Sequence, residues 1–89
     1  MPFFVYLLEC RDGSFYCGYT KDLEKRLIKH NTGSASKYTR ARLPVRMVYF
    51  EKTKNKSSAL KREHAIKRLG RKAKEKLVSE KELVSKSAH

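Results

Sequence analysis

Five side chains in this 89-residue chain are candidates for one site that moves protons, binds an anion and holds a cation. A phenol or an imidazole can transfer a proton, a guanidinium can form two parallel hydrogen bonds to an anion, and a carboxylate can hold a metal ion. The five residues are Tyr6, Tyr16, Arg26, His30 and Glu63. They can act together only if the fold brings distant segments to one place.

The two tyrosines belong to the stretch "FVYLLECRDGSFYCGYT", which predicts two strands joined at an Asp-Gly turn. A two-residue turn would place Tyr6 and Tyr16 on opposite faces of the sheet. A three-residue loop, with Gly13 in the left-handed conformation, pairs Tyr6 with Gly18 and places both phenols on one face. The sequence permits both loops. In the second, Gly18 would leave open space beside Tyr6 and keep the floor of a site clear.

Hydrophobic patterning and turn residues predict the remaining elements. We expect strands over 3–10, 14–19 and 45–51 and helices over 21–30, 57–69 and 71–78. Thr20 is the expected N-cap of the first helix and Gly70 the expected end of the second. Residues 3–10 are apolar at both parities, which is typical of a central strand covered on both faces. The predicted fold is one α/β (α+β) domain over residues 1–78, with a three-stranded, mainly antiparallel sheet flanked by helices, followed by a flexible tail over residues 79–89.

The first helix is predicted to turn two of the candidate side chains toward the sheet. Leu23 and Leu27 mark its buried stripe, His30 falls inside that stripe and Arg26 lies at its edge. Each has a plainer explanation. Arg26 could simply pair with Asp22 one turn earlier, and His30 could cap the C-terminal end of the helix.

Glu63 stands within the apolar pattern of the second helix. Ala59 and Ile66 define one side of the stripe, Leu60 defines the other, and Glu63 lies between them. A carboxylate in that position is costly unless it is paired, hydrogen-bonded or bound to a cation. A salt bridge to Lys67 is the plainer alternative to a metal site.

The composition narrows the class of partner. There are 22 Lys and Arg against 9 acidic residues, a formal charge of +13, yet 39% of residues are hydrophobic, which excludes a disordered basic tail. A compact basic body attracts polyanions, nucleic-acid phosphates first and anionic membrane surfaces second, although the positive charge could also serve solubility alone.

No apolar run is long enough to span a bilayer and the first residues lack a basic signal region, so we expect a cytoplasmic protein. Cys10 and Cys17 fit free thiols there, because their spacing is not typical of a zinc site with His30 and His64.

Taken in order, "VYL", "YCG", "KRLIKHN" and "ALKREHAIK" resemble the GIY-YIG nuclease family, above all its small stand-alone members. The resemblance covers residues 3–78. It implies the three-residue hairpin loop and a single active site that hydrolyses phosphodiester bonds. The residues that match the family's site are Tyr6, Tyr16, Arg26, His30 and Glu63.

The resemblance also implies a role for each of these side chains. Tyr6 would accept a proton from water, which requires its pKa to be lowered from about 10. Tyr16 would position water or phosphate, and His30 would relay a proton. Arg26 would form two hydrogen bonds to the non-bridging oxygens. Glu63 would bind Mg²⁺ or Mn²⁺, which acts as a Lewis acid on the leaving group.

A basic segment between the first helix and the third strand is expected to grip a nucleic-acid strand, with its tyrosine stacked on a base. The alternative is a solvated loop that buries a core tyrosine. The residues are Lys37, Tyr38, Thr39, Arg40 and Arg42. The expected partner is nucleic acid, with DNA favoured over RNA and no membrane, and a protein partner is compatible with this.

The leading hypothesis is a metal-dependent endonuclease acting on structured or branched DNA. Many family nucleases carry an asparagine after the catalytic glutamate, whereas Asn31 and Asn55 both precede Glu63. That difference favours an alternative, a nucleic-acid-binding module of the same fold with weak or no cleavage. A third hypothesis is a basic interaction protein whose anionic partner is not nucleic acid.

Overall fold

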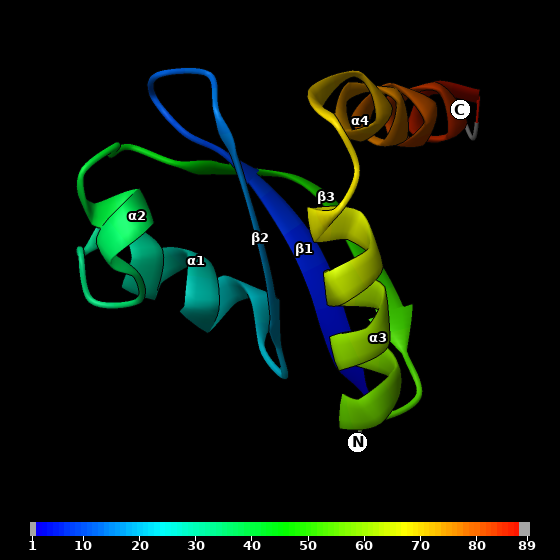
Figure 1. The fold of residues 1–89 in the computed structure, drawn as a ribbon, viewed down its shortest axis with the longest axis horizontal. Coiled ribbons are helices and arrows are strands. Elements are labelled where there is room, and N and C mark those ends of the chain that lie inside the picture. Colours follow the sequence, from blue (N-terminus) through cyan, green and yellow to red (C-terminus); the bar gives the residue numbers. More distant parts are fainter. Residues whose placement is uncertain (1, 88–89) are drawn as a thin grey trace.

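The structure is a computed structural model that describes residues 2–87, with side chains described as far as residue 80. The elements are β1 (Phe3–Glu9), β2 (Phe15–Thr20), α1 (Leu23–Asn31), α2 (Lys37–Arg40), β3 (Arg46–Thr53), α3 (Lys56–Lys67) and α4 (Arg71–Ser87). The strands form one antiparallel sheet in the order β2-β1-β3 (Figure 1). This architecture confirms the predicted fold class and the central position of the first strand.

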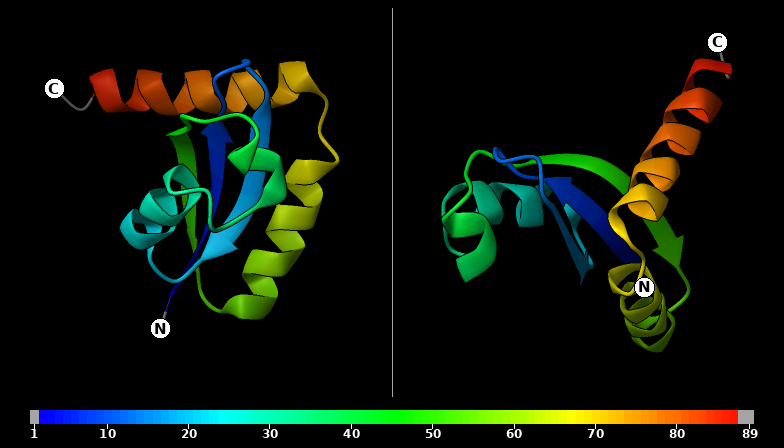
Figure 2. Two further views of the ribbon diagram at one scale, coloured as in Figure 1. Left: turned by 90° about the vertical axis from the view of Figure 1, so that its left-hand side faces the viewer. Right: turned by 45° about the horizontal axis from the view of Figure 1, so that its top comes forward.

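The helices form a layer on each face of the sheet, with α1 and α2 on one side and α3 and α4 on the other (Figure 1). β1 is buried on both faces. Val5 and Leu7 pack with Ile66 of α3, whereas Leu8 packs against Leu27 of α1. Figure 2 shows α4 lying across one end of the sheet, with its last turns projecting beyond it. No helix in the described part of the chain is long and apolar enough to cross a membrane.

The hairpin between β1 and β2 closes with the three-residue loop. Leu8 pairs with Tyr16 and Tyr6 pairs with Gly18, so both tyrosines stand on the same face. Gly13 has a φ of 84°, in the left-handed region that the loop requires. The register therefore resolves the alternative that the sequence left open.

The start of the first helix differs from the prediction. α1 begins at Leu23, and the Asp22 carboxylate caps it by accepting a hydrogen bond from the Lys25 backbone N–H. Thr20 is instead the last residue of β2, and its hydroxyl oxygen accepts a hydrogen bond from the Asp22 backbone N–H. Thr20 as N-cap was wrong because the chain needs two more residues to leave the strand.

The second predicted helix also ends differently. α3 stops at Lys67 with Arg68 in a right-handed conformation as its cap, so Gly70 is not the residue that terminates it. Leu60 was placed on the apolar stripe but is 40% exposed, and only the side of α3 that carries Ala59 and Ile66 is buried. α4 was expected to end at residue 78, yet its helical backbone continues through part of the predicted tail.

Candidate active site

The phenol of Tyr6 lies across Gly18, its partner on β2. A Cβ atom at Gly18 would lie 2.5 Å from the Tyr6 hydroxyl oxygen, so no larger residue fits without displacing the ring. The Tyr6 side chain is almost completely buried. The missing side chain of Gly18 therefore makes room for the Tyr6 ring, and Gly18 itself lines the cleft that opens beside this ring.

His30 of α1 connects Tyr6 of the sheet to Thr39 of α2. Its Nε2 lies 2.8 Å from the Tyr6 hydroxyl oxygen, and its Nδ1 lies 2.9 Å from the Thr39 hydroxyl oxygen. The ring also meets the Tyr16 ring in an edge-to-face contact, with centroids 5.1 Å apart. His30 is thus buried between both tyrosines and Thr39, and its side chain is not a cap at the end of α1.

Both members of the Tyr6–His30 pair are neutral near pH 7. Burial, reinforced by the neighbouring Tyr16, raises the pKa of Tyr6 well above its usual value, and the charge of Arg26 only partly opposes this. Burial also lowers the pKa of His30 to about 4, and Arg26 acts in the same direction. The expected lowering of the Tyr6 pKa was wrong, because loss of hydration outweighs the nearby positive charge.

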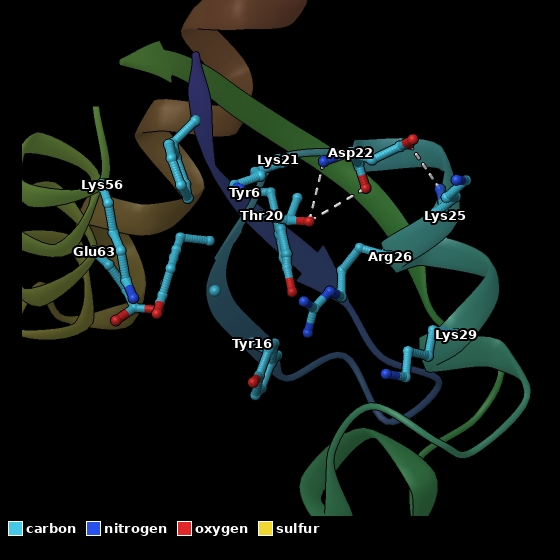
Figure 3. A pocket seen from close by; sticks show the side chains of 13 residues that line it. Tyr6, Tyr16, Thr20, Lys21, Asp22, Lys25, Arg26, Lys29, Lys56 and Glu63 are labelled. Atoms are coloured by element: carbon cyan, nitrogen blue, oxygen red, sulfur yellow. Dashed lines mark hydrogen bonds between the residues drawn. The ribbon is translucent and has the colours of Figure 1, made fainter. Parts of the chain in front are cut away.

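A cleft of about 580 Å³ opens beside these rings, between α1 and α3 (Figure 3). Its described lining includes Tyr6 and Tyr16 and two carboxylates, Asp22 and Glu63. Its cationic side chains are Lys21, Lys25, Arg26, Lys29 and Lys56. Such an excess of positive charge in a concave site concentrates anions.

Arg26 and Glu63 face this cleft from opposite sides. Figure 3 shows the Arg26 guanidinium pointing from α1 toward Tyr6, with Glu63 across from it on α3. No ion pair joins Arg26 to Asp22 in the described part of the chain, whereas Glu63 does pair with Lys67 at 3.7 Å. That pair is weak, because the Lys67 side chain is 52% exposed to water. Both Arg26 and Glu63 can therefore engage a ligand.

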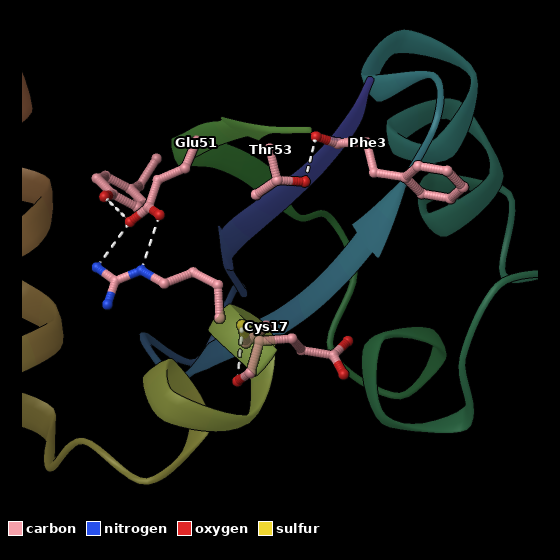
Figure 4. A network of polar contacts seen from close by, with 7 residues as sticks. Phe3, Cys17, Glu51 and Thr53 are labelled. Atoms are coloured by element: carbon pink, nitrogen blue, oxygen red, sulfur yellow. Dashed lines mark hydrogen bonds and ion pairs between the residues drawn. The ribbon is translucent and has the colours of Figure 1, made fainter. Parts of the chain in front are cut away.

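A polar network on the other face of the sheet holds α3 in place (Figure 4). Arg62 of α3 donates two hydrogen bonds of 2.8 Å to the Glu51 carboxylate of β3, which also accepts one from the Tyr49 hydroxyl. The Cys17 thiol of β2 points at the backbone oxygen of Glu63, 3.9 Å away. These contacts fix the segment of α3 from which Glu63 reaches the cleft.

The Glu63 carboxylate is a ligand of the type that magnesium and manganese ions bind. Mg²⁺ typically binds one or two protein carboxylates and fills its other positions with water and substrate phosphates. The cleft offers this combination, with the Glu63 carboxylate on its α3 side and space for water. The described residues contain no group of three or more His, Cys, Asp or Glu side chains that could hold a metal, so Cys10, Cys17, His30 and His64 do not form a zinc site. In addition, burial raises the pKa of the Cys17 thiol to about 12, which disfavours the thiolate that a metal ion binds.

The basic segment contains α2, a short helix that no pattern in the sequence predicted. Ser36 caps it by accepting a hydrogen bond from the Tyr38 backbone N–H. Thr39 faces inward, is fully buried and contacts His30. Thr39 therefore cannot touch a nucleic acid in this fold, and its expected place among the gripping residues was wrong.

The other residues of this segment remain at the surface to different degrees. Lys37 and Arg40 are exposed. Tyr38 is 37% exposed, and its ring centroid lies 6.1 Å from that of Tyr16. Arg42 lies over the Tyr38 ring, 3.8 Å from its centroid, and donates a hydrogen bond to the Tyr38 carbonyl. Tyr38 is therefore partly engaged within the protein rather than standing free in a loop.

Neither asparagine substitutes for the residue that many family members carry after the glutamate. The Asn31 side chain donates to the carbonyl of Val45 and accepts from its N–H, at 3.0 and 2.9 Å, which ties α1 to the start of β3. Asn55 caps α3 by accepting from the Ser58 N–H. Both asparagines are structural.

Sequence reasoning missed several residues of the site. The four cleft lysines were not singled out, although Lys21, Lys25 and Lys29 recur every fourth residue, a spacing that places side chains along one side of a helix. The contact of Thr39 with His30 had no such signal. It depends on where α2 folds back, which no local pattern indicates.

Comparisons with known proteins identify the family of the chain. A family model described as the GIY-YIG catalytic domain matches residues 2–76. The chain belongs to the GIY-YIG family. It is 54% identical over 77 residues to a UPF0213 protein of Staphylococcus saprophyticus, covering 86% of this chain and 94% of that one. A UPF0213 protein of Haloquadratum walsbyi is 49% identical, covering 86% of each.

Two solution structures of GIY-YIG relatives have the same fold. The UPF0213 protein BH0048 of Bacillus halodurans is 47% identical, with a TM-score of 0.57 over 89% of this chain and 84% of that one. The protein EF2693 of E. faecalis is 45% identical, with a TM-score of 0.62 over 93% of this chain and 88% of that one. The chain is therefore a member of a nuclease family and shares its fold with these relatives.

Proposed function

We propose that the protein is a divalent-metal-dependent endonuclease that hydrolyses phosphodiester bonds, with structured or branched DNA as its favoured substrate. The observation that carries the proposal is the convergence of four side chains on one cationic cleft, with a fifth, His30, buried behind them. Tyr6 of β1 is bonded to His30 of α1, Tyr16 of β2 borders both, and Arg26 and Glu63 face each other across the opening.

The neutral Tyr6–His30 pair suits proton removal from water. A water molecule in the cleft gives a proton to the Tyr6 oxygen while the Tyr6 hydroxyl gives its own proton to Nε2 of His30. The resulting hydroxide attacks phosphorus, the bond to the leaving oxygen breaks, and that oxygen takes a proton from solvent. Because the two transfers are coupled, Tyr6 need not exist as a free phenolate, which its raised pKa disfavours.

Arg26 and Tyr16 provide the contacts to phosphate. The planar guanidinium of Arg26 can donate two hydrogen bonds to the non-bridging oxygens, where negative charge builds up in the transition state. Tyr16, edge-on to His30 at the mouth of the cleft, can orient the phosphate or the attacking water. The charge of the bound phosphate also favours the imidazolium form that His30 adopts after proton transfer.

Glu63 is the residue that would hold the metal ion. When bound there, Mg²⁺ or Mn²⁺ supplies Lewis-acid stabilisation of the charge on the leaving oxygen. The weak pairing of Glu63 with Lys67 leaves the carboxylate available, since an exposed lysine is readily displaced.

Nucleic-acid binding fits the charge around the cleft. The lysines of its rim can neutralise successive phosphates, and exposed Lys37 and Arg40 of α2 extend the cationic surface away from the reacting groups. Tyr38 could add a stacking contact with a base, although Arg42 already covers part of its ring. These contacts recognise backbone and shape more than base sequence.

A second candidate function is a binding module that retains the fold without efficient cleavage. Two observations favour it. Both asparagines have structural roles, so none is free to replace the residue that follows the glutamate in many family nucleases, and Glu63 already has Lys67 as an ionic partner.

A panel of labelled substrates separates the two functions. Branched, single-stranded and duplex DNA and RNA are incubated with Mg²⁺, with Mn²⁺ or with chelator. A nuclease gives discrete products only with metal, most from branched DNA, and Glu63→Gln removes them while Glu24→Gln, an exposed glutamate outside the cleft, does not. Binding to the same substrates without cleavage under any condition would instead establish the binding module.

A further inference from the structure

Thr39 occupies the side of His30 that faces away from Tyr6. Its side chain is fully buried, and its hydroxyl oxygen lies 2.9 Å from Nδ1 of His30 and 3.3 Å from the carbonyl oxygen of Ser36. A buried chain of hydrogen bonds therefore runs from Tyr6 through His30 and Thr39 to Ser36. Which atom donates in each bond decides whether the Tyr6 oxygen presents its proton or its lone pairs to the cleft.

One direction satisfies every contact. A carbonyl oxygen only accepts, so the Thr39 hydroxyl donates to Ser36. The Thr39 oxygen then accepts from Nδ1–H of His30. Nε2 is left with its lone pair, which accepts the hydroxyl proton of Tyr6. The three bonds share one orientation, in which each strengthens the next.

Reversing the donors and acceptors would leave poorer hydrogen bonding both at Thr39 and at Tyr6. If Thr39 donated to Nδ1, its bond to Ser36 would be lost, and Nε2–H would donate to the Tyr6 oxygen. The Tyr6 proton would then point into the cleft toward Arg26, whose guanidinium has donors but no acceptor (Figure 3). Arg26 instead favours the arrangement that turns the lone pairs of Tyr6 toward it.

We propose that Thr39 is a positioning residue that holds His30 in the Nδ1–H tautomer and thereby aims the Tyr6 proton at His30 and the Tyr6 lone pairs at the cleft. Only this tautomer leaves Tyr6 ready to accept a proton from a molecule bound there. That catalytic consequence rests on the proposed nuclease function, whereas the tautomer itself does not.

The hydroxyl group of Thr39 is the part of the side chain that holds His30 in this tautomer. No buried side-chain nitrogen or oxygen in the described part of the protein lacks a hydrogen-bond partner. Thr39→Val keeps the shape of the side chain but removes the acceptor, so it would leave Nδ1–H of His30 buried without one. Thr39→Ser keeps the acceptor and removes only a methyl group.

The test is ¹⁵N NMR of the histidine ring nitrogens in the metal-free protein near neutral pH. Wild type and Thr39→Ser should show His30 protonated at Nδ1 alone, and Thr39→Val should shift it toward Nε2–H. The exposed His64 serves as an internal control that no variant alters. A wild-type His30 protonated at Nε2 would overturn the proposal even if Thr39→Val does not fold, as would a Thr39→Val protein with the wild-type tautomer.

Cleavage assays on the same proteins test the consequence separately. Thr39→Val should lower the rate about 10- to 100-fold, by analogy with the effect of removing the outer hydrogen bond of a metal-ligating histidine, and Thr39→Ser should restore most of it. If no variant and no wild-type sample cleaves, the nuclease function fails while the NMR result on Thr39 still stands. Equal cleavage by the valine and serine variants contradicts the catalytic part of the proposal.

Discussion

Two tyrosines on opposite faces of the sheet use the same functional group in different ways. Tyr6 faces α1, whereas Tyr49 of β3 pairs with Leu7 and faces α3. Burial is the first cause that raises the pKa of each phenol, that of Tyr49 to about 12. The difference lies in the acceptor. Tyr49 donates to the Glu51 carboxylate, while Tyr6 contacts the neutral imidazole of His30.

The nature of the acceptor decides whether the proton can move. Arg62 forms two hydrogen bonds to Glu51, so this ion pair works as a clamp between α3 and β3. An imidazole can take up a proton and release it again, and Tyr6 also borders the cleft. A buried tyrosine is therefore structural or reactive according to its partner and its access to substrate.

The largest expected effect comes from removing each hydroxyl in turn. Tyr6→Phe should lower cleavage by about 10²- to 10⁴-fold, the typical contribution of an acid–base group. Tyr49→Phe should leave cleavage nearly unchanged and lower the free energy of unfolding by about 1 kcal/mol, because it loses one hydrogen bond. Single-turnover rates and denaturant melts measure both. Equal loss of activity in the two variants would remove the distinction between the tyrosines.

Arginine-to-lysine substitutions sharpen the same comparison. Arg26→Lys keeps the charge in the cleft but loses the planar fork, so nucleic-acid binding should persist while cleavage falls by about 10²-fold. Arg62→Lys weakens the clamp on Glu51 and should reduce stability slightly without affecting the rate. Full activity in Arg26→Lys would show that two parallel hydrogen bonds from this side chain are not used.

Lysines in and outside the cleft should differ in their effect on salt dependence. Lys25→Gln with Lys29→Gln removes two cleft cations, so the slope of log affinity against log salt should become shallower by about 1.5. Lys61→Gln with Lys72→Gln, at exposed positions of α3 and α4, is the matched control and should change it little. Identical slopes for the two pairs would indicate diffuse binding rather than binding at the cleft.

The last expected effect is a pH dependence of stability. The pKa of His30 is about 4 in the folded protein and about 6.5 in an unfolded chain. As the pH falls from about 6.5 toward 4, the unfolded state gains a proton that the folded state excludes, so stability declines. His30→Gln should flatten the fall in melting temperature across this window, and His64→Gln should not. An unchanged pH profile in His30→Gln would mean that His30 does not titrate in this way.

Much of the fold could be predicted from sequence because local patterns encode it. The doubly apolar run of β1 indicated a central strand, and the loop glycine together with the family resemblance placed Tyr6 and Tyr16 on one face. Long-range packing was less accessible. The inward turn of Thr39 depends on how α2 folds against α1, and Leu60 is exposed because only one side of α3 meets the sheet. The raised pKa of Tyr6 follows from burial, which a motif does not reveal.

The most direct test of the nuclease assignment is a paired measurement of cleavage and thermal unfolding for wild type and Glu63→Gln, each with and without Mg²⁺. The wild type should cleave only with Mg²⁺ and should melt at a higher temperature in its presence. Glu63→Gln should not cleave with Mg²⁺, and Mg²⁺ should not raise its melting temperature. Its metal-free stability should fall by less than about 1 kcal/mol, because the Lys67 end of the lost pair is exposed to water. A Glu63→Gln protein that is clearly destabilised yet cleaves as the wild type does would contradict the account and make Glu63 a structural residue.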